Sequence, residues 1–280
     1  MTSHARRPGR PRAGRLALEF DDFYFEVDPS AGGRVTAFCL GDVDVLAGRD
    51  VDAANYGSTL WTSPQSDWGW PPPAAFDREP YAVVESNGAI GLVGKASDSL
   101  GVLLEKRFSP DRARGAIRLE YVIRNVAASP KTYAPWEVSR VHPGGLTFFP
   151  TGAHASGPLA VERRADATWF SHDPAILDDA GKKHSADGLG GFVAHAASGL
   201  LFVKAFGDLL PEEQAPGEGE VEIYGNNRYV EIEVQGPYAR IGPFAAVSWA
   251  VTWTLAKLPV GLPVTVGNAE LLALASTIAG

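Results

Sequence analysis

The sequence is poor in sulfur and in long apolar runs. It contains one cysteine, Cys39, and one methionine, Met1, among 280 residues. A single cysteine excludes an internal disulfide framework and any metal site built from several cysteines, so we expect a buried structural thiol. No run of 18 apolar residues occurs, and the sequence therefore predicts no transmembrane helix.

Basic residues are also scarce outside the first part of the chain. The net charge is −8, although residues 1–15 carry five arginines and no acidic residue. The rest of the chain is therefore strongly acidic, which disfavours nucleic acid and anionic membranes as partners. We expect residues 1–15 to form a disordered basic arm, with a nucleic-acid tail as the alternative. No apolar segment follows the arginines, so we predict no signal peptide and a cytoplasmic location.

Several common catalytic motifs are missing. There is no G-x-S-x-G, no P-loop and no H-E-x-x-H, and the six histidines show no metal-ligand spacing. These absences favour a protein without a metal and without a cofactor.

What the sequence does contain is strand-like alternation. Apolar and polar residues alternate over 16–20, 117–123 and 247–255, and 31 glycines and 21 prolines supply turns. We therefore predict an all-β antiparallel sandwich with few short helices, formed by residues 16–280 as a single domain. A short C-terminal helix begins after Asn268, whereas residues 51–80 and 164–190 lack periodicity and are predicted as long loops. Further strands are predicted at 81–86, 89–94, 101–108, 133–141, 145–149, 191–196, 199–206, 219–224 and 229–235.

Residues 55–72 combine three tryptophans with small polar side chains. An indole face covers the C–H face of a pyranose, and amides and carboxylates bind its hydroxyls. The candidate sugar-binding residues here are Asn55, Gln65, Asp67, Trp68 and Trp70. Alternatively, the tryptophans pack a long loop onto the sandwich and the polar groups satisfy its backbone.

A second segment, residues 134–142, carries both aromatic and ionisable groups. On a strand, Trp136, Arg140 and His142 share one face and Glu137 lies on the other. Burial of Glu137 would raise its pKa, which suits a general acid, but an ion pair is an equal alternative. His142 is a second candidate acid, or a plain turn residue. Arg140 and Arg228 suit a phosphate or a uronate, or serve as structural ion pairs.

The third segment is the strand predicted over 229–235. Glu231, Glu233 and Gln235 share one of its faces. Three polar side chains in a row indicate either a solvated face or the floor of a polar cleft, where a carboxylate can act as a general base.

These segments, in this order, resemble the galactose-mutarotase-like superfamily, which includes the aldose 1-epimerases. The resemblance extends over residues 16–257, and the tryptophan-rich segment is most similar to a bacterial branch. In the closing strands, the Glu233-Val234-Gln235 spacing matches the family's E-x-Q motif. The other matching segments are Gly32-Gly33-Arg34-Val35, residues 130–150, Ile241-Gly242-Pro243 and residues 249–255.

The resemblance implies a β-supersandwich with a sugar cleft and no cofactor. Glu233, or Glu231, would be the base, and Glu137 occupies the position of the family's central-strand histidine. Trp68, Trp70 and Trp136 would form the sugar platform. Three functions follow: anomer exchange on a small sugar, sugar binding without turnover, or polysaccharide cleavage by a lyase or hydrolase.

Overall fold

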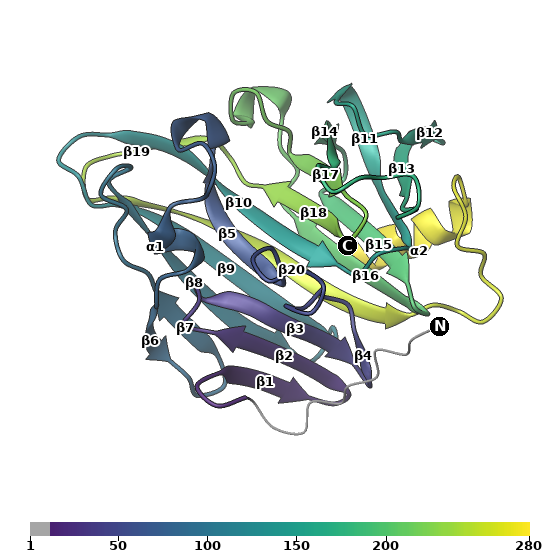
Figure 1. Ribbon diagram of the computed structural model, residues 1–280, viewed down its shortest axis with the longest axis horizontal. Helices are drawn as coiled ribbons and strands as arrows, with labels where there is room; N and C mark the ends of the chain where they lie inside the picture. The colour runs from purple at the N-terminus through teal and green to yellow at the C-terminus, as the bar shows by residue number, and fades with distance from the viewer. Residues whose placement is uncertain (1–11) are drawn as a thin grey trace.

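The computed structural model describes residues 12–280 as two packed antiparallel sheets (Figure 1). The predicted all-β sandwich is confirmed. Most of the predicted basic arm, residues 1–11, lies outside the described residues. Within residues 12–280, no helix is both long and apolar enough to cross a membrane.

The first sheet carries the candidate site. Its strand order is β1-β2-β3-β5-β10-β18-β17-β14, with the short β4 beside β3 and the second half of β11 (Leu146–Ser156) beside β14. The strands are β1 (Leu16–Phe20), β2 (Phe23–Asp28), β3 (Arg34–Leu40), β4 (Val43–Asp44), β5 (Ser58–Ser63), β10 (Lys131–Val141), β14 (Lys182–Gly188), β17 (Val221–Gly225) and β18 (Val230–Gln235).

The second sheet packs against one face of the first sheet. Its order is β6-β7-β8-β9-β20-β16-β15-β11-β13-β12, so β11 joins both sheets, while β19 (Ala239–Ile241) extends the start of β10. The strands are β6 (Ala82–Glu85), β7 (Ile90–Val93), β8 (Val102–Asp111), β9 (Ala116–Asn125), β11 (Leu146–Ser156), β12 (Glu162–Arg164), β13 (Ala167–Ser171), β15 (Phe192–Ala197), β16 (Leu200–Phe206) and β20 (Ala246–Lys257).

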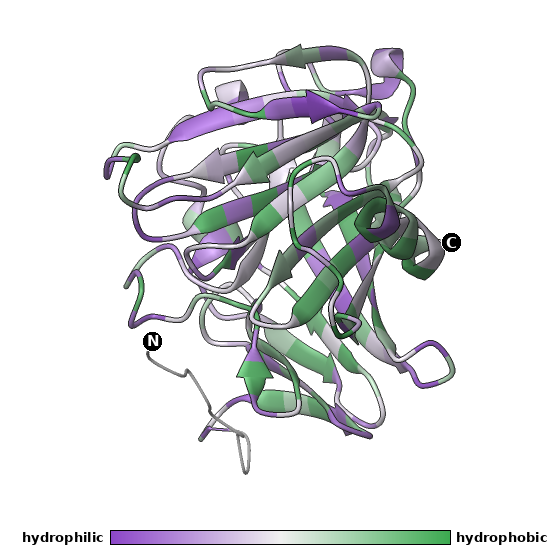
Figure 2. Cartoon of the chain, turned by 90° about the vertical axis from the view of Figure 1, so that its right-hand side faces the viewer, coloured by the Kyte–Doolittle hydropathy of each residue, from purple (hydrophilic) through white to green (hydrophobic). Residues whose placement is uncertain are grey.

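The hydrophobic core fills the space between the two sheets. Alternating residues of β9 and β20, such as Ile123 and Trp253, meet Phe25 and Phe38 from the first sheet. The hydrophobic colouring in Figure 2 follows the central strands and helix α2 (Ala269–Ala279). Cys39 is fully buried, as predicted, and burial raises the pKa of its thiol.

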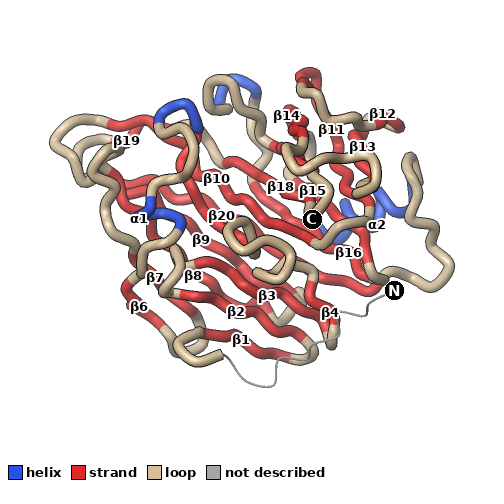
Figure 3. Tube along the Cα trace, in the orientation of Figure 1, coloured by secondary structure: helices blue, strands red, loops and turns tan. Residues whose placement is uncertain are grey.

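Helices are few and peripheral (Figure 3). Helix α2 (Ala269–Ala279) packs on β15 and β16, and the Asn268 side chain caps it by accepting hydrogen bonds from two backbone N–H groups. The prediction of unbroken loops at 51–80 and 164–190 was wrong. The first contains β5, η1 (Gln65–Asp67) and α1 (Ala74–Asp77), and the second contains β13 and β14. β5 is buried on both faces, so it shows no alternation.

The Gly32-Gly33-Arg34 segment anchors the loop that leads to the site. Arg34 donates to the carbonyl oxygens of Ala54 and Tyr56, and its other nitrogen pairs with Asp77 at 2.8 Å. Gly32 has a φ of +70°, and a Cβ there would lie 2.3 Å from the Asp77 carbonyl oxygen. Only glycine therefore allows α1 to approach the sheet this closely.

Candidate functional site

A pocket of about 270 Å³ lies over the face of the first sheet that points away from the second sheet. β5, β10, β18, β17 and β14 form its floor, and the loops before and after β5 form its rim. The lining residues are Asn55, Trp61, Gln65, Trp70, Trp136, Lys183, Tyr224, Tyr229, Glu231 and Glu233.

Tryptophans form one wall of the pocket. Trp61 and Trp136 are paired across β5 and β10 and meet edge to face at 5.5 Å. Trp70 packs edge to face on Trp61 at 6.0 Å and leaves 60 % of its surface exposed at the rim. Trp68 contacts both Trp61 and Trp136, and its indole N–H donates a hydrogen bond to the Thr62 carbonyl oxygen. Trp68 therefore supports the wall from outside the pocket lining.

Glu233 is the most buried ionisable group of the pocket. Its Oε2 accepts hydrogen bonds from Trp136 Nε1 and Lys183 Nζ, both at 2.9 Å. Its Oε1 is buried and has no hydrogen-bond partner among residues 12–280. Burial raises the pKa of Glu233 to about 8, opposed by the Lys183 charge and reinforced by the Glu222 and Glu231 carboxylates.

Lys183 stands between two carboxylates. Its Nζ lies 2.9 Å from Glu233 Oε2 and 2.9 Å from Glu222 Oε2, and 4.7 Å from the centre of the Trp136 ring. The side chain is 32 % exposed. Burial lowers the pKa of Lys183, but the two carboxylates outweigh it, and the net shift is upward.

Glu231 and Arg140 form a second ion pair beside Glu233. Arg140 is fully buried; its Nε donates to Glu231 Oε1 at 2.8 Å and its Nη1 to Thr59 Oγ1 at 2.9 Å. Arg228 likewise pairs with Asp52 at 2.6 Å. Both arginines are thus engaged by carboxylates, which favours the structural alternative over reception of a phosphate or uronate.

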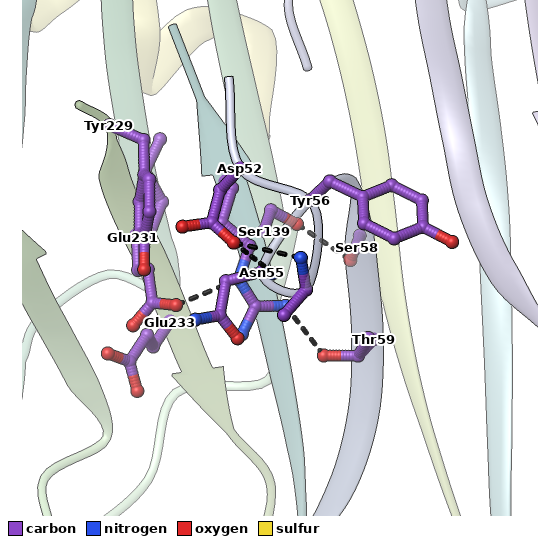
Figure 4. Close-up of polar contacts among 12 residues, drawn as sticks. Asp52, Asn55, Tyr56, Ser58, Thr59, Ser139, Tyr229, Glu231 and Glu233 are labelled. Carbon is purple, nitrogen blue, oxygen red and sulfur yellow. Dashed lines mark hydrogen bonds and ion pairs between the residues drawn. The ribbon is translucent and has the colours of Figure 1, made fainter. Parts of the chain in front are cut away.

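The loop before β5 places Asn55 over this ion pair. Asp52 Oδ1 accepts hydrogen bonds from the backbone N–H groups of Ala54 and Asn55. Figure 4 shows Asn55 facing Glu231 across the site, while Tyr229, Glu231 and Glu233 follow one another along the same chain segment. Burial raises the pKa of Tyr229, so its phenol remains a neutral hydrogen-bonding group.

The position of Glu137 requires a correction. Its side chain lies on the opposite face of β10, inside the core, and is fully buried. It accepts hydrogen bonds from Tyr121 Oη at 2.7 Å and Trp253 Nε1 at 3.0 Å, and it pairs with Lys204 Nζ at 2.9 Å. Glu137 therefore cannot reach a sugar in the pocket, and the ion-pair alternative describes it correctly.

His142 and Asp67 also lie outside the pocket lining. His142 borders a small cavity with Asp44 and His195, beyond the end of β10. Its face on the extrapolated strand matches that of Trp136, but β10 ends at Val141. Asp67 is exposed in η1. Of the predicted residues, the structure brings Asn55, Gln65, Trp70, Trp136, Glu231 and Glu233 into the lining and places Arg140 beneath Glu231.

Four lining residues were not predicted from the sequence. Trp61 lies in a strand that was predicted as a loop, and Tyr224 and Tyr229 flank a turn that was read only for its glycine and asparagines. Lys183 lies on β14, within the second predicted loop. The register of β14 against β17, with Lys183 opposite Tyr224, brings it into the site. No local sequence pattern predicts that β14 pairs with β17.

No protein-family model and no curated protein matches this sequence. Solved structures are nevertheless similar. A galactose mutarotase-like protein from Lactobacillus casei ATCC 334 has a TM-score of 0.61 at 10 % identity, over 87 % of this chain and 100 % of the other. A galactose mutarotase related enzyme from Lactobacillus acidophilus has a TM-score of 0.61 at 8 % identity, over 87 % and 97 %.

A third similar structure is the Slr1438 protein from Synechocystis sp. PCC 6803. Its TM-score is 0.57 at 14 % identity, and the match covers 92 % of this chain and all of the other. These likenesses agree with the strand order and the two-layer packing described above. This chain therefore has the fold of the galactose mutarotase-like proteins.

Proposed function

We propose that the pocket binds a single sugar ring and exchanges its anomers, with Glu233 as the general base. The observation that carries the proposal is the Glu233 carboxylate in an indole-walled pocket. One of its oxygens is held by Trp136 and Lys183, and the other has no partner among residues 12–280. A buried acceptor without a partner is rare in folded proteins, and a ligand hydroxyl that reached this oxygen would complete its hydrogen bonding.

The chemistry is a proton transfer at each end of the anomeric centre. Glu233 takes the proton of the anomeric hydroxyl, the bond between C1 and the ring oxygen breaks, and the ring oxygen gains a proton. Rotation about the C1–C2 bond and ring closure then give the other anomer. Because the pKa of Glu233 is raised to about 8, its carboxylate is a stronger base than an ordinary glutamate.

The pocket's size and the similar structures support a small sugar. A volume of about 270 Å³ lies just below the range of ligand pockets, which starts at about 300 Å³. This favours one ring over a polysaccharide chain, and so disfavours the lyase or hydrolase alternative. The names of the similar proteins, a galactose mutarotase-like protein and a galactose mutarotase related enzyme, point to the same substrate class.

The test is anomeric exchange measured by NMR saturation transfer over aldoses, uronates and sugar phosphates. We expect the protein to accelerate exchange of at least one neutral aldose, and Glu233→Gln to abolish the acceleration. Glu162→Gln serves as the control, because Glu162 is an exposed strand glutamate outside the lining. Exchange that survives in Glu233→Gln would rule out this base.

Sugar binding without turnover is the second candidate. It is favoured by the engagement of Glu233 with Lys183, because an ion pair holds a carboxylate in place and opposes its protonation. In that case sugar signals broaden on binding but no anomer exchanges faster, and Glu233→Gln changes only the affinity.

A further inference from the structure

Lys183 is the single cationic side chain that lines the pocket within residues 12–280. Its ammonium is hydrogen-bonded to Glu233 at 2.9 Å, next to the Glu233 oxygen that has no partner. Its side chain is 32 % exposed and lines the pocket, unlike Lys204, which is 1 % exposed. Lys183 is therefore a proton donor at the surface of the site.

We propose that Lys183 is the general acid of the site and donates a proton to the sugar ring oxygen while Glu233 takes one from the anomeric hydroxyl. This inference rests on the proposed function of the pocket. It identifies the acid after the two candidates from the sequence have been placed elsewhere, Glu137 in the core and His142 beyond the end of β10.

The proton transfers balance over one catalytic cycle. In ring opening, the Lys183 N–H bond breaks, the ring oxygen gains that proton, the C1–O bond breaks, and Glu233 gains the anomeric hydroxyl proton. In ring closure, Glu233 returns its proton to the carbonyl oxygen, and the neutral Lys183 amine takes the proton of the C5 hydroxyl. Both side chains end in their starting states, so the reaction needs no other reactant.

The ion pair couples the two transfers. Glu222 and Glu233 together hold the pKa of Lys183 above its ordinary value. When Glu233 accepts a proton, Lys183 loses one of its two neutralising carboxylates. The lysine therefore becomes a stronger acid at the stage at which the ring oxygen develops charge. Glu222 is 1 % exposed and stays on Lys183 throughout, which fixes the ammonium in position.

The other hydrogen-bonding groups of the lining are less suited to this role. Tyr224 Oη already donates to the Ala180 carbonyl at 3.0 Å. Tyr229 is 3 % exposed and neutral, so loss of its proton would leave a buried phenolate beside the Glu231 carboxylate, whereas Lys183 becomes neutral when it donates. Trp136 Nε1 already donates to Glu233, and an indole N–H is far too weak an acid to protonate the ring oxygen.

The test compares Lys183→Arg with Lys183→Ala in the full-length protein. Arginine keeps the charge and can keep both ion pairs, but it does not release a proton. We expect Lys183→Arg to bind the exchanged sugar within about threefold of the native affinity, while its exchange rate falls by about 100-fold or more. Lys182→Met is the matched control, because Lys182 is an exposed neighbour outside the lining.

Chemical rescue distinguishes a proton donor from a residue that only supports the structure. We expect added alkylamines to restore exchange in Lys183→Ala, with a rate that depends on the pKa of the amine. Lys183→Arg exchanging within threefold of the native rate, or rescue that ignores the amine pKa, would overturn the acid role alone. A native protein that exchanges no sugar of the panel would overturn the proposed function and the acid role together.

Discussion

Glu137 and Glu233 lie on opposite faces of the first sheet, each paired with a lysine, and the surroundings of the two pairs differ. In the core, Glu137 pairs with Lys204 at 2.9 Å, and both side chains are buried. In the pocket, Glu233 pairs with Lys183 at the same distance, but the lysine is 32 % exposed. Both oxygens of Glu137 have donors, whereas Glu233 Oε1 has none among residues 12–280.

The comparison separates a structural pair from a candidate reactive pair. A buried carboxylate whose partners are complete on every side holds strands together and offers nothing to a ligand. The same pair at a pocket wall, with one oxygen unmatched, is prepared for an incoming hydroxyl. Burial and a charged partner are common to both, so neither feature alone identifies the site.

The largest difference between the pairs should appear on removal of the lysine. We expect Lys204→Met to destabilise the fold by about 3–5 kcal/mol, because it leaves the buried Glu137 charge without its cation. Lys183→Met should cost less, about 1–3 kcal/mol, since this lysine is 32 % exposed and Glu233 can hold a proton instead, while Glu222 still loses its cation. Urea unfolding of both variants measures the difference. Equal losses would contradict the distinction.

Substitution of the tryptophan that donates to each glutamate tests the same comparison with a smaller expected effect. Trp253→Phe removes a donor to Glu137, and Trp136→Phe removes a donor to Glu233. We expect the first to lower the free energy of unfolding by about 1.5–3 kcal/mol, as for a lost hydrogen bond to a charged group. The second should lower it less and should raise the pH at which exchange is half-maximal. Thermal unfolding and exchange at several pH values report the two effects.

The pH dependence of exchange follows from the raised pKa of Glu233. A general base works as the carboxylate, and below about pH 8 the ionised fraction of Glu233 falls about tenfold for each pH unit. We therefore expect exchange to increase with pH, to be half-maximal near pH 8 and to level off above it. A midpoint near 4.5, the ordinary value, would show that Glu233 is not the titrating base.

The smallest effect is expected at the rim. Trp70 is 60 % exposed, and Trp70→Ala should change stability by less than about 0.5 kcal/mol. We expect it to weaken sugar binding by about 2- to 10-fold, because one aromatic face is lost. Leu210→Ala is the matched control at 59 % exposure and should leave affinity unchanged. NMR titration measures both.

Much of the fold was predictable because alternation is a local signal. The strands over 117–123 and 247–255 appear as β9 and β20, and the cap at Asn268 begins helix α2. β5 was missed because strands buried on both faces do not alternate. The site was predictable in part: the parity of β18 places Glu231 and Glu233 on one face, and that face lines the pocket.

The same parity rule explains the error at Glu137. Alternation along β10 already separates Glu137 from Trp136, so the two cannot serve one pocket. The sequence does not reveal which face meets the second sheet. That depends on Tyr121, Trp253 and Lys204, which approach Glu137 from three other strands.

The sequence by itself determined the class of fold, the faces of individual strands and the aromatic character of the sugar-binding candidates. These depend on side-chain period and type within a few residues of one another. Only the tertiary structure decided that Lys183 meets Glu233, since 50 residues and an intervening strand separate them. Pairing over such distances is set by the packing of the whole sandwich, because no local preference selects one distant strand as a neighbour over another.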